Sequence, residues 1–362
     1  MKAKLQNKIN LKDYSGDAYI GIDVHRKSYS VAIIVERIVV KKLRLPADGL
    51  KLLAFLRKIL PKAKLHSVYE AGFSGYPLHR ILSTGKINNI IVNPASIQVA
   101  SASRVKTDKL DAIKLAEHLS LGLLKGIRIR TVAEEEQRLL SRNRAQLVRD
   151  RVRMMARSRM RLIQFDLLPV SFDKVLTLRQ VKNLLNNKSV SQSFKLGMSH
   201  LINVWEQIES ELKLINYKYQ ARQKEDPLVT QYMKVPGIGL KTGIVLADEL
   251  LDCSQFKSEK ALFSFIGFTP SEHSSGETVR KGRITRQGNP QLRFMLIQSA
   301  WVAIRCDPAL RSFYGRVAAR RGANKAIVAV ARKLVGRARA VIKNKANYEL
   351  NYNKTNTLQL AA

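Results

Sequence analysis

Cysteine is almost absent from this chain of 362 residues, which contains only Cys253 and Cys306. The two are far apart and belong to no metal-binding pattern. Their scarcity excludes a disulfide-stabilised secreted scaffold and a thiolate zinc site. We expect both to be small core residues of a reduced, cytoplasmic protein.

Membrane signals are also missing. The sequence has no apolar run long enough to cross a bilayer, no Lys-rich amphipathic anchor and no lipidation signal. Residues 1–16 are polar and basic and lack the apolar core of a signal peptide. The sequence therefore predicts a protein without a membrane partner, whose residues 1–16 form a flexible basic arm.

Acidic residues are few. The chain has 28 Asp and Glu against 64 Lys and Arg, which gives a formal net charge of +36. A charge of this size favours a polyanionic partner, and nucleic acid is the natural candidate. The affinity for duplex DNA is then expected to fall steeply with salt. Each phosphate neutralised adds about 0.9 to the slope of the logarithm of the binding constant against the logarithm of the salt concentration.

Four of the scarce acids stand where a metal-dependent nuclease needs them. Asp23 closes the apolar strand predicted at 19–23, whose hairpin partner is predicted at 29–35. Glu70 ends the next apolar run, 67–70. Asp108 and Asp111 open a helical pattern, and their spacing places both on one helix face.

Carboxylates that lie close together repel one another unless a cation binds between them. Oxygen ligands suit Mg²⁺ or Mn²⁺, and no His or Cys cluster competes for the assignment. Two such ions would activate a nucleophile and stabilise a leaving oxygen. Each acid also has an ordinary structural interpretation: Asp23 as a turn residue, Glu70 as a solvated strand end, Asp108 as a helix N-terminal acid.

The chain is too long for one core, so several domains are expected. Residues 17–125 alternate strands and helices, with further strands near 38–45 and 89–92 and helices near 50–60 and 76–83. This pattern predicts an α/β layer domain, and a hairpin followed by strands crossed by helices suits a ribonuclease H-like core. Residues 126–228 turn helical.

The helical middle segment carries two patterns. Apolar residues recur at heptad spacing through Leu201, Trp205, Ile208, Leu212, Ile215 and Tyr219, which predicts a helical hairpin or coiled coil. The preceding helix carries nine arginines with Asp150 as the only acid among them: Arg138, Arg142, Arg144, Arg149, Arg151, Arg153, Arg157, Arg159 and Arg161. Unpaired, they would repel one another, so this helix is expected to bind phosphates rather than present a merely solvated face.

Residues 229–347 form a third predicted region, mainly helical. It opens with Pro236-Gly237-Ile238-Gly239, a loop like that of a helix-hairpin-helix, feeding a helix predicted at 244–251. A plain connecting turn is the alternative. Further on, Ser274-Ser275-Gly276 begins a stretch in which residues 275–347 hold 17 Lys and Arg against two acids. A serine among arginines can attack a phosphodiester, although such a triplet is ordinarily a turn.

The candidate nucleic-acid contacts come from these basic segments and glycine loops. They are Lys106, Arg142, Arg149, Arg153, Arg157, Gly237, Gly239, Lys241, Arg280, Arg283, Arg286 and Arg293. No base-reading motif is evident, so backbone contacts are expected. Residues 348–362 are predicted to be a disordered tail.

Two motif sets together resemble the insertion-sequence-110 family of transposases. The first comprises Asp23 in its strand, Glu70 before Ala71-Gly72, and the segment 106–112 around Asp108 and Asp111. The second comprises the Pro-Gly-Ile-Gly loop, the segment 267–270, Ser275-Gly276 and the segment 282–289. The resemblance runs from about residue 18 to 345, in the family's order.

The resemblance implies a bacterial or archaeal DNA recombinase associated with the nucleoid. It has a RuvC-like domain, a coiled coil and a C-terminal transposase domain. Asp23, Glu70, Asp108 and Asp111 would be the Mg²⁺ ligands and Ser275 the nucleophile that forms a 5′-phosphoserine, with Ser274 the lesser candidate. The family's partners are donor and target DNA and a noncoding bridge RNA from the same element, and its members assemble as tetramers, as a dimer of dimers.

Two other classes of function remain open at this point. A metal-dependent nuclease of the Holliday-junction type would need only the carboxylates and would use water as its nucleophile. A nucleic-acid-binding protein without catalysis would need neither the carboxylates nor Ser275. The presence of a second motif set in the C-terminal region favours the recombinase.

Overall fold

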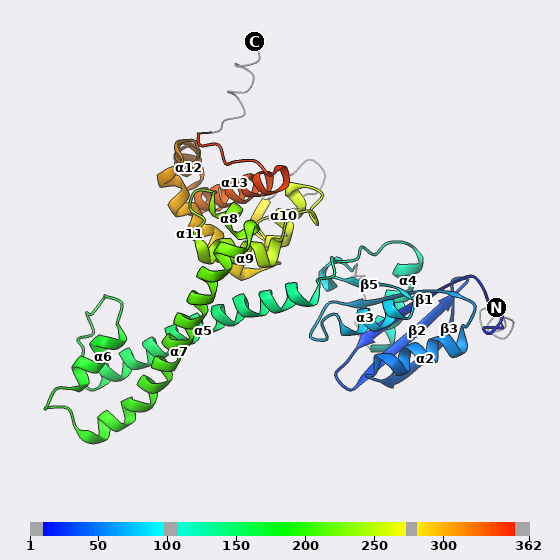
Figure 1. Ribbon diagram of the computed structural model, residues 1–362, viewed down its shortest axis with the longest axis horizontal. Coiled ribbons are helices and arrows are strands. Elements are labelled where there is room, and N and C mark those ends of the chain that lie inside the picture. Colours follow the sequence, from blue (N-terminus) through cyan, green and yellow to red (C-terminus); the bar gives the residue numbers. More distant parts are fainter. Residues whose placement is uncertain (1–9, 98–107, 273–280, 352–362) are drawn as a thin grey trace, which may run out of the picture. The chain divides into compact units, whose positions relative to one another are not determined.

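A five-stranded sheet forms the centre of the first of two units (Figure 1). The computed structural model describes residues 10–97, 108–272 and 281–351 and divides into Met1–Thr131 and Val132–Ala362. The division falls later than the boundary predicted after residue 125. Each unit is described by itself below.

The sheet has the order β3-β2-β1-β4-β5. Its strands are β1 (Asp17–Val24), β2 (Ser28–Val35), β3 (Ile38–Pro46), β4 (Lys64–Glu70) and β5 (Asn88–Val92). Strands β1, β2 and β3 pair antiparallel, whereas β1, β4 and β5 pair parallel. A mixed α/β fold with a hairpin followed by crossed strands was predicted from the sequence, and the five-stranded mixed sheet confirms it at that level.

Helices cover the sheet on both faces. On one face, α2 (Gly49–Ile59) and α3 (Pro77–Thr84) pack on alternate residues of the strands, among them Ile20, Ile22 and Tyr69. On the other face, α4 (Asp108–Ser120) packs on Ala32 and Val68 through its own apolar residues. Because side chains alternate along a strand, residues 21 and 23 of β1 and residue 70 of β4 belong to the α4 face.

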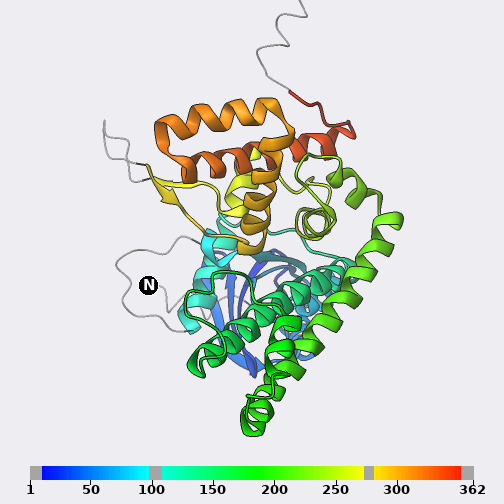
Figure 2. The same ribbon diagram turned by 90° about the vertical axis from the view of Figure 1, so that its left-hand side faces the viewer.

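The second unit begins with two long helices that pack on each other, α5 (Val132–Gln164) and α7 (Gln192–Glu225), joined through the short α6 (Leu178–Leu185) (Figures 1 and 2). The α7 positions of the predicted heptad from Trp205 to Tyr219 are buried. They pack partly on Met154 and Leu162 of α5. Burial of this apolar stripe explains why helices of this length form here.

In the described part of this unit, six further helices and an antiparallel strand pair follow. They are α8 (Pro227–Met233), α9 (Leu240–Leu250), α10 (Glu259–Ile266), β6 (Pro270–Glu272), β7 (Lys281–Ile284), α11 (Pro290–Cys306), α12 (Pro308–Arg321) and α13 (Ala323–Asn344). Helices α12 and α13 lie side by side, as Figure 2 shows. The core gathers around α9, which is buried along most of its length, and α13.

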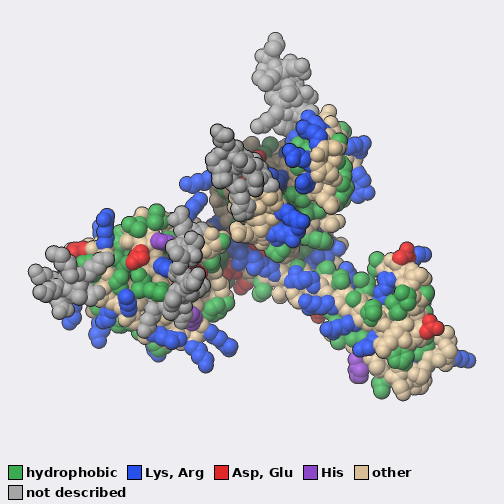
Figure 3. Space-filling model, turned by 180° about the vertical axis from the view of Figure 1, so that it is seen from behind, with side chains coloured by type: hydrophobic (Ala, Val, Ile, Leu, Met, Phe, Trp, Pro, Cys, Tyr) green, Lys and Arg blue, Asp and Glu red, His purple; other side chains and the backbone are tan. Residues whose placement is uncertain are grey.

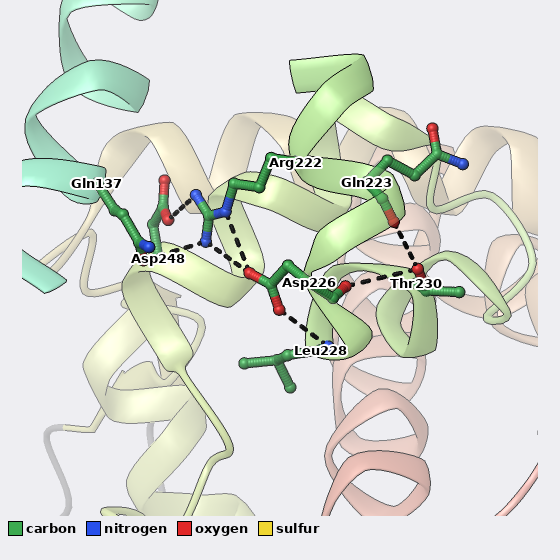
Figure 4. A network of polar contacts seen from close by, with 7 residues as sticks. All are labelled: Gln137, Arg222, Gln223, Asp226, Leu228, Thr230 and Asp248. Atoms are coloured by element: carbon green, nitrogen blue, oxygen red, sulfur yellow. Dashed lines mark hydrogen bonds and ion pairs between the residues drawn. The ribbon is translucent and has the colours of Figure 1, made fainter. Parts of the chain in front are cut away.

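Two consecutive acids of α9 hold the unit together. Asp248 is fully buried and accepts a 2.6 Å bond from Arg222 of α7, which also contacts Asp226 at the N-cap of α8 and Gln137 of α5 (Figure 4). Burial raises the pKa of Asp248, and the charge of Arg222 holds that rise back. The next residue, Glu249, is 2% exposed and pairs with Arg142 of α5 at 2.9 Å.

Replacing Arg222 with Met is expected to destabilise this unit. The substitution leaves the Asp248 carboxylate buried without its cation, and removing one partner of a buried pair costs about 3 to 5 kcal/mol. The melting temperature should fall by roughly 10 °C. Lys224→Met removes an exposed charge from the same helix and should leave the melting temperature within about 1 °C; an equal loss in both variants would contradict this assignment.

The segment after α13 is tied to the helical core. The Tyr348 hydroxyl donates to Asp307 at 2.6 Å, and Arg337 lies 2.7 Å from the same carboxylate. Asp307 also caps the N-terminus of α12. Burial alone would raise the pKa of Asp307, but the bonds and charge of Tyr348 and Arg337 lower it overall. Tyr348, which the sequence analysis placed in a disordered tail, is therefore held against the helical core, and residues 352–362 lie outside the described residues.

Within residues 10–97, 108–272 and 281–351, we find no helix that combines the length and the apolar character needed to cross a membrane.

Candidate active site and nucleic-acid interface

Two of the predicted carboxylates lie at the same end of neighbouring strands. Ile22 of β1 pairs in parallel with Tyr69 of β4, so Asp23 and Glu70 follow at the same level. Both residues belong to the sheet face that α4 covers, because they alternate with residues packed on α2 and α3. Asp23 remains 24% exposed, which leaves its carboxylate accessible to a ligand.

Helix α4 lies directly on β1 beside this position. A Cβ at Gly21 would overlap the carbonyl oxygen of Ala112 and lie 2.7 Å from the amide nitrogen of Ala116. Only glycine permits this approach, which brings the first turns of α4 against the strand that carries Asp23. Asp111 precedes Ala112 and is half-buried, and Asp108 is the first residue of the helix.

The donor set suits a divalent cation that prefers oxygen ligands, because it consists of carboxylates from two strand ends and one helix start. His25 adds a contact, with its Nε2 atom 3.1 Å from Asp23 Oδ2. The side chain of Asp108 lies outside the described residues. In the described part of the chain, no three His, Cys, Asp or Glu side chains already converge on a metal position.

Gly21→Ala tests the position of α4. The added methyl must push the helix away from β1, so we expect a lower melting temperature and at least a tenfold loss of the nuclease activity that the sequence predicts, the order of effect that displaced catalytic groups produce. Gly72 lies two residues after Glu70 and has open space around it. Gly72→Ala should leave both properties nearly unchanged; equal effects would contradict the close-contact argument.

The predicted nucleophile, Ser275, and its neighbour Ser274 lie outside the described residues, as do Lys106 and Arg280. The strands on either side of positions 273–280 are described. β6 and β7 pair antiparallel, with Glu272 opposite Lys281. Arg283 on β7 and Arg286 beyond it are exposed. Arg293 is half-buried and donates to the Ile266 carbonyl at 2.8 Å. Burial and the neighbouring charge of Arg286 lower the pKa of the Arg293 guanidinium.

The arginines of α5 do not all carry free charges, and the expectation that they are unpaired is wrong for several. Arg142 pairs with buried Glu249, Arg153 with Asp150 at 2.8 Å and, more loosely, Arg151 with Glu209 at 3.8 Å. The partners of Arg142 and Arg151 come from other helices, so the local sequence could not reveal them. Arg149 donates to neutral Gln146, and Arg157 is exposed. Figure 3 shows the surplus of Lys and Arg over Asp and Glu on one face.

The two glycines of the predicted phosphate loop have different roles. Gly237 adopts φ +80°, and a Cβ there would overlap the Ser299 carbonyl, so this glycine serves close packing on α11. Gly239 has open space around it and is the N-cap of α9. The predicted helix 244–251 begins at Leu240 instead, so Lys241 lies in its first turn.

The first unit is compatible with the domain of a DEDD nuclease, and comparison with known proteins defines the class further. A DEDD transposase model of the insertion-sequence-110 type matches residues 20–165, and the model described as "Transposase IS116/IS110/IS902 family" matches residues 230–315. The chain belongs to this family of insertion-sequence transposases, which are enzymes that cleave and recombine DNA.

Relatives with names of this kind align over most of the chain. A transposase for insertion sequence element IS1533 from Leptospira borgpetersenii is 27% identical over 78% of this chain and 84% of its own length. The pilin gene-inverting protein of Moraxella bovis is 30% identical over 72% of this chain and 74% of its own length. The transposase for insertion sequence element IS1111A of Coxiella burnetii is 27% identical over 63% of this chain and 64% of its own length.

Proposed function

We propose that this transposase cuts and rejoins donor and target DNA through a covalent phosphoserine at Ser275, with divalent cations held by Asp23, Glu70, Asp108 and Asp111 and with a bridge RNA as guide. The level placement of Asp23 and Glu70 on adjacent strands beneath α4 supports the metal site. The match of residues 230–315 to the family's second model supports a catalytic role for the region that contains Ser275 and favours the recombinase over a nuclease. The strand order with β1 and β4 at the centre supports a ribonuclease H-like assignment.

Mg²⁺, or Mn²⁺ in its place, would supply charge stabilisation at the scissile phosphate when bound. The chain's own contribution is to orient the oxygen ligands. β1 and β4 fix Asp23 and Glu70, and the contact at Gly21 fixes the start of α4. The Asp23–His25 contact restrains the rotation of the Asp23 carboxylate.

The proposed transfer step is a transesterification. The Ser275 hydroxyl gives up its proton as its oxygen forms a bond to phosphorus, the bond from phosphorus to the 3′ oxygen breaks, and that oxygen takes up a proton and leaves as a hydroxyl. The phosphate stays on the 5′ end, so the bond energy is kept for rejoining. The exposed Arg283 on β7 and Arg286 beyond it support this role, since they place positive charge on the described chain that follows Ser275 in sequence.

A guide RNA would supply sequence choice by base pairing and leave the protein to hold backbones. The net charge of +36 and the exposed Arg149 and Arg157 on α5 support this division of work. A tetramer in which the carboxylates of one subunit meet the serine of another would explain why one chain carries both motif sets.

A hydrolytic nuclease of the Holliday-junction type is the second candidate. The level placement of Asp23 and Glu70 favours it equally, because that geometry also serves water as a nucleophile.

The RNA is tested by omission. Purified protein, Mg²⁺ and a labelled duplex of the element's end are incubated with and without RNA transcribed from the adjoining noncoding DNA. The proposal predicts cleavage at the element boundary only with the matching RNA. A third reaction with an RNA of equal length and scrambled loops is the control and should give no cleavage there. Equal cleavage in all three reactions would exclude the guide.

A further inference from the structure

A hollow of about 500 Å³ opens between two helices of the second unit. Three residues of α7, namely Asn216, Tyr219 and Gln220, line one side of it, and residues 239–242 at the start of α9 line the other. The volume is within the range of ligand sites. Most of its lining surface is apolar, and the side chains of Asn216, Gln220, Lys241 and Thr242 add polar groups to it.

The start of α9 faces this hollow without a cap. Gly239 is the N-cap and supplies no side chain, whereas Asp48, Ser191 and Asp226 cap their helices with side-chain oxygens. Gly239 is exposed, and the position that its side chain would occupy is open. Uncapped N–H groups and the helix dipole attract an anion.

Positive charge gathers around the same hollow with little compensation. Lys241 is part of its lining. Arg144 of α5 is half-buried, donates to the Asn216 amide oxygen at 3.2 Å and lies 5.8 Å from the Tyr219 ring centroid. Among the residues described, no carboxylate forms an ion pair with Arg144. Burial and the charges of Arg144 and Arg151 lower the pKa of Lys241.

Tyr219 adds an independent observation. It is 2% exposed and lines the hollow, and within the described ranges its hydroxyl has no hydrogen-bond partner. A buried phenol ordinarily finds a partner, and an unpaired one costs free energy. Burial and the charge of nearby Asp248 raise its pKa to about 12, with Arg144 opposing, so the hydroxyl keeps its proton and can donate.

We propose that this hollow is a binding site for one backbone phosphate of a nucleic acid, held by the N–H groups at the start of α9, by Lys241 and by Arg144, with Tyr219 and Thr242 as neutral donors. The ligand is a phosphodiester, which DNA and RNA both supply. Contacts of this kind position a strand without reading its sequence. The site lies within one unit and does not require the cleavage chemistry proposed above, so either proposal can fail alone.

The decisive variant is Gly239→Asp. Because φ at Gly239 is −85° and its surroundings are open, a side chain fits, and an aspartate there caps α9 and preserves or raises the melting temperature. Its carboxylate also takes the position of the phosphate. Gly239→Asn is the matched control, with the same cap and no charge.

Binding is measured by fluorescence anisotropy over a salt series, with a duplex DNA lacking element sequence and with an RNA hairpin. We expect Gly239→Asp to weaken binding roughly tenfold or more and to lower the salt slope by about 0.9 on duplex DNA. Gly239→Asn should stay within about twofold. A loss on one nucleic acid only identifies the source of the phosphate and supports the site.

A second pair of variants checks the charge. Lys241→Gln should lower the salt slope in the same way, whereas Lys218→Gln, which removes an exposed charge from α7 beside Tyr219, should not. The site is overturned by unchanged binding in Gly239→Asp, by equal losses in the Asp and Asn variants, or by equal slopes for Lys241→Gln and Lys218→Gln.

Discussion

Asp23→Asn is expected to lower DNA cleavage by roughly a thousandfold, since metal-centred charge stabilisation supplies several kcal/mol to phosphoryl transfer. The amide keeps the shape of the carboxylate but removes its charge. The pairing of β1 with β2 and β4 runs through the backbone, so the fold should persist and the melting temperature should change by little. The measurement is the rate of nicking of a labelled element-end duplex with saturating RNA and Mg²⁺.

The same strand provides the control. Asp17 begins β1 at the opposite end and contacts His66 at 2.8 Å. Asp17→Asn removes one acidic charge from the same strand, and it should leave the rate within about twofold. Comparable losses in the two variants would show that overall charge, rather than the site at the ends of β1 and β4, governs the reaction.

Ser275→Ala is expected to eliminate the covalent adduct and with it all strand joining. Without the hydroxyl no bond to phosphorus forms, and hydrolysis at the site cannot store the energy that rejoining requires. Binding should remain, because Ser275 carries no charge. The adduct is detected as a labelled band of low mobility on a denaturing gel.

Ser274→Ala is the matched control, one residue away in the same Ser-Ser-Gly segment. It should retain the adduct. If the adduct survives in Ser275→Ala and disappears in Ser274→Ala, the nucleophile has been assigned to the wrong serine. Joining that proceeds in both single variants would remove the serine mechanism altogether.

The sheet could be predicted closely from the sequence, because its signals are local. Alternation through residues 19–35 and the apolar runs ending at Glu70 and Val92 mark strands. The face on which Asp23 and Glu70 lie follows from the same alternation. What the pattern could not supply is the contact at Gly21, since it joins β1 to a helix about ninety residues later.

The helical unit was less accessible to prediction because its specific contacts are distant in sequence. Asp248 and Glu249 appear as ordinary helix residues, yet each binds an arginine from another helix. Arg142 was therefore predicted to contact nucleic acid although its partner is buried Glu249. The start of α9 was placed too late because Gly243, which packs on α8, resembles a loop residue.

The phosphate hollow illustrates the same limit. Gly239 and Lys241 were identified from the glycine loop, but Arg144 and Tyr219 come from two other helices. A half-buried arginine beside a phenol without a partner is a property of packing, and no spacing in the sequence encodes it. Ser275 was identified by family resemblance alone.

The most direct test of the central claim is to locate the phosphate on the protein. Protein, guide RNA, Mg²⁺ and a duplex labelled at its element end are incubated, denatured and digested with protease, and the peptide attached to DNA is sequenced by mass spectrometry. The account predicts a 5′-phosphate ester on Ser275 that forms only when Asp23 is intact. Nicked DNA with free ends and no linked peptide, still dependent on Asp23, would contradict it and identify a hydrolytic nuclease.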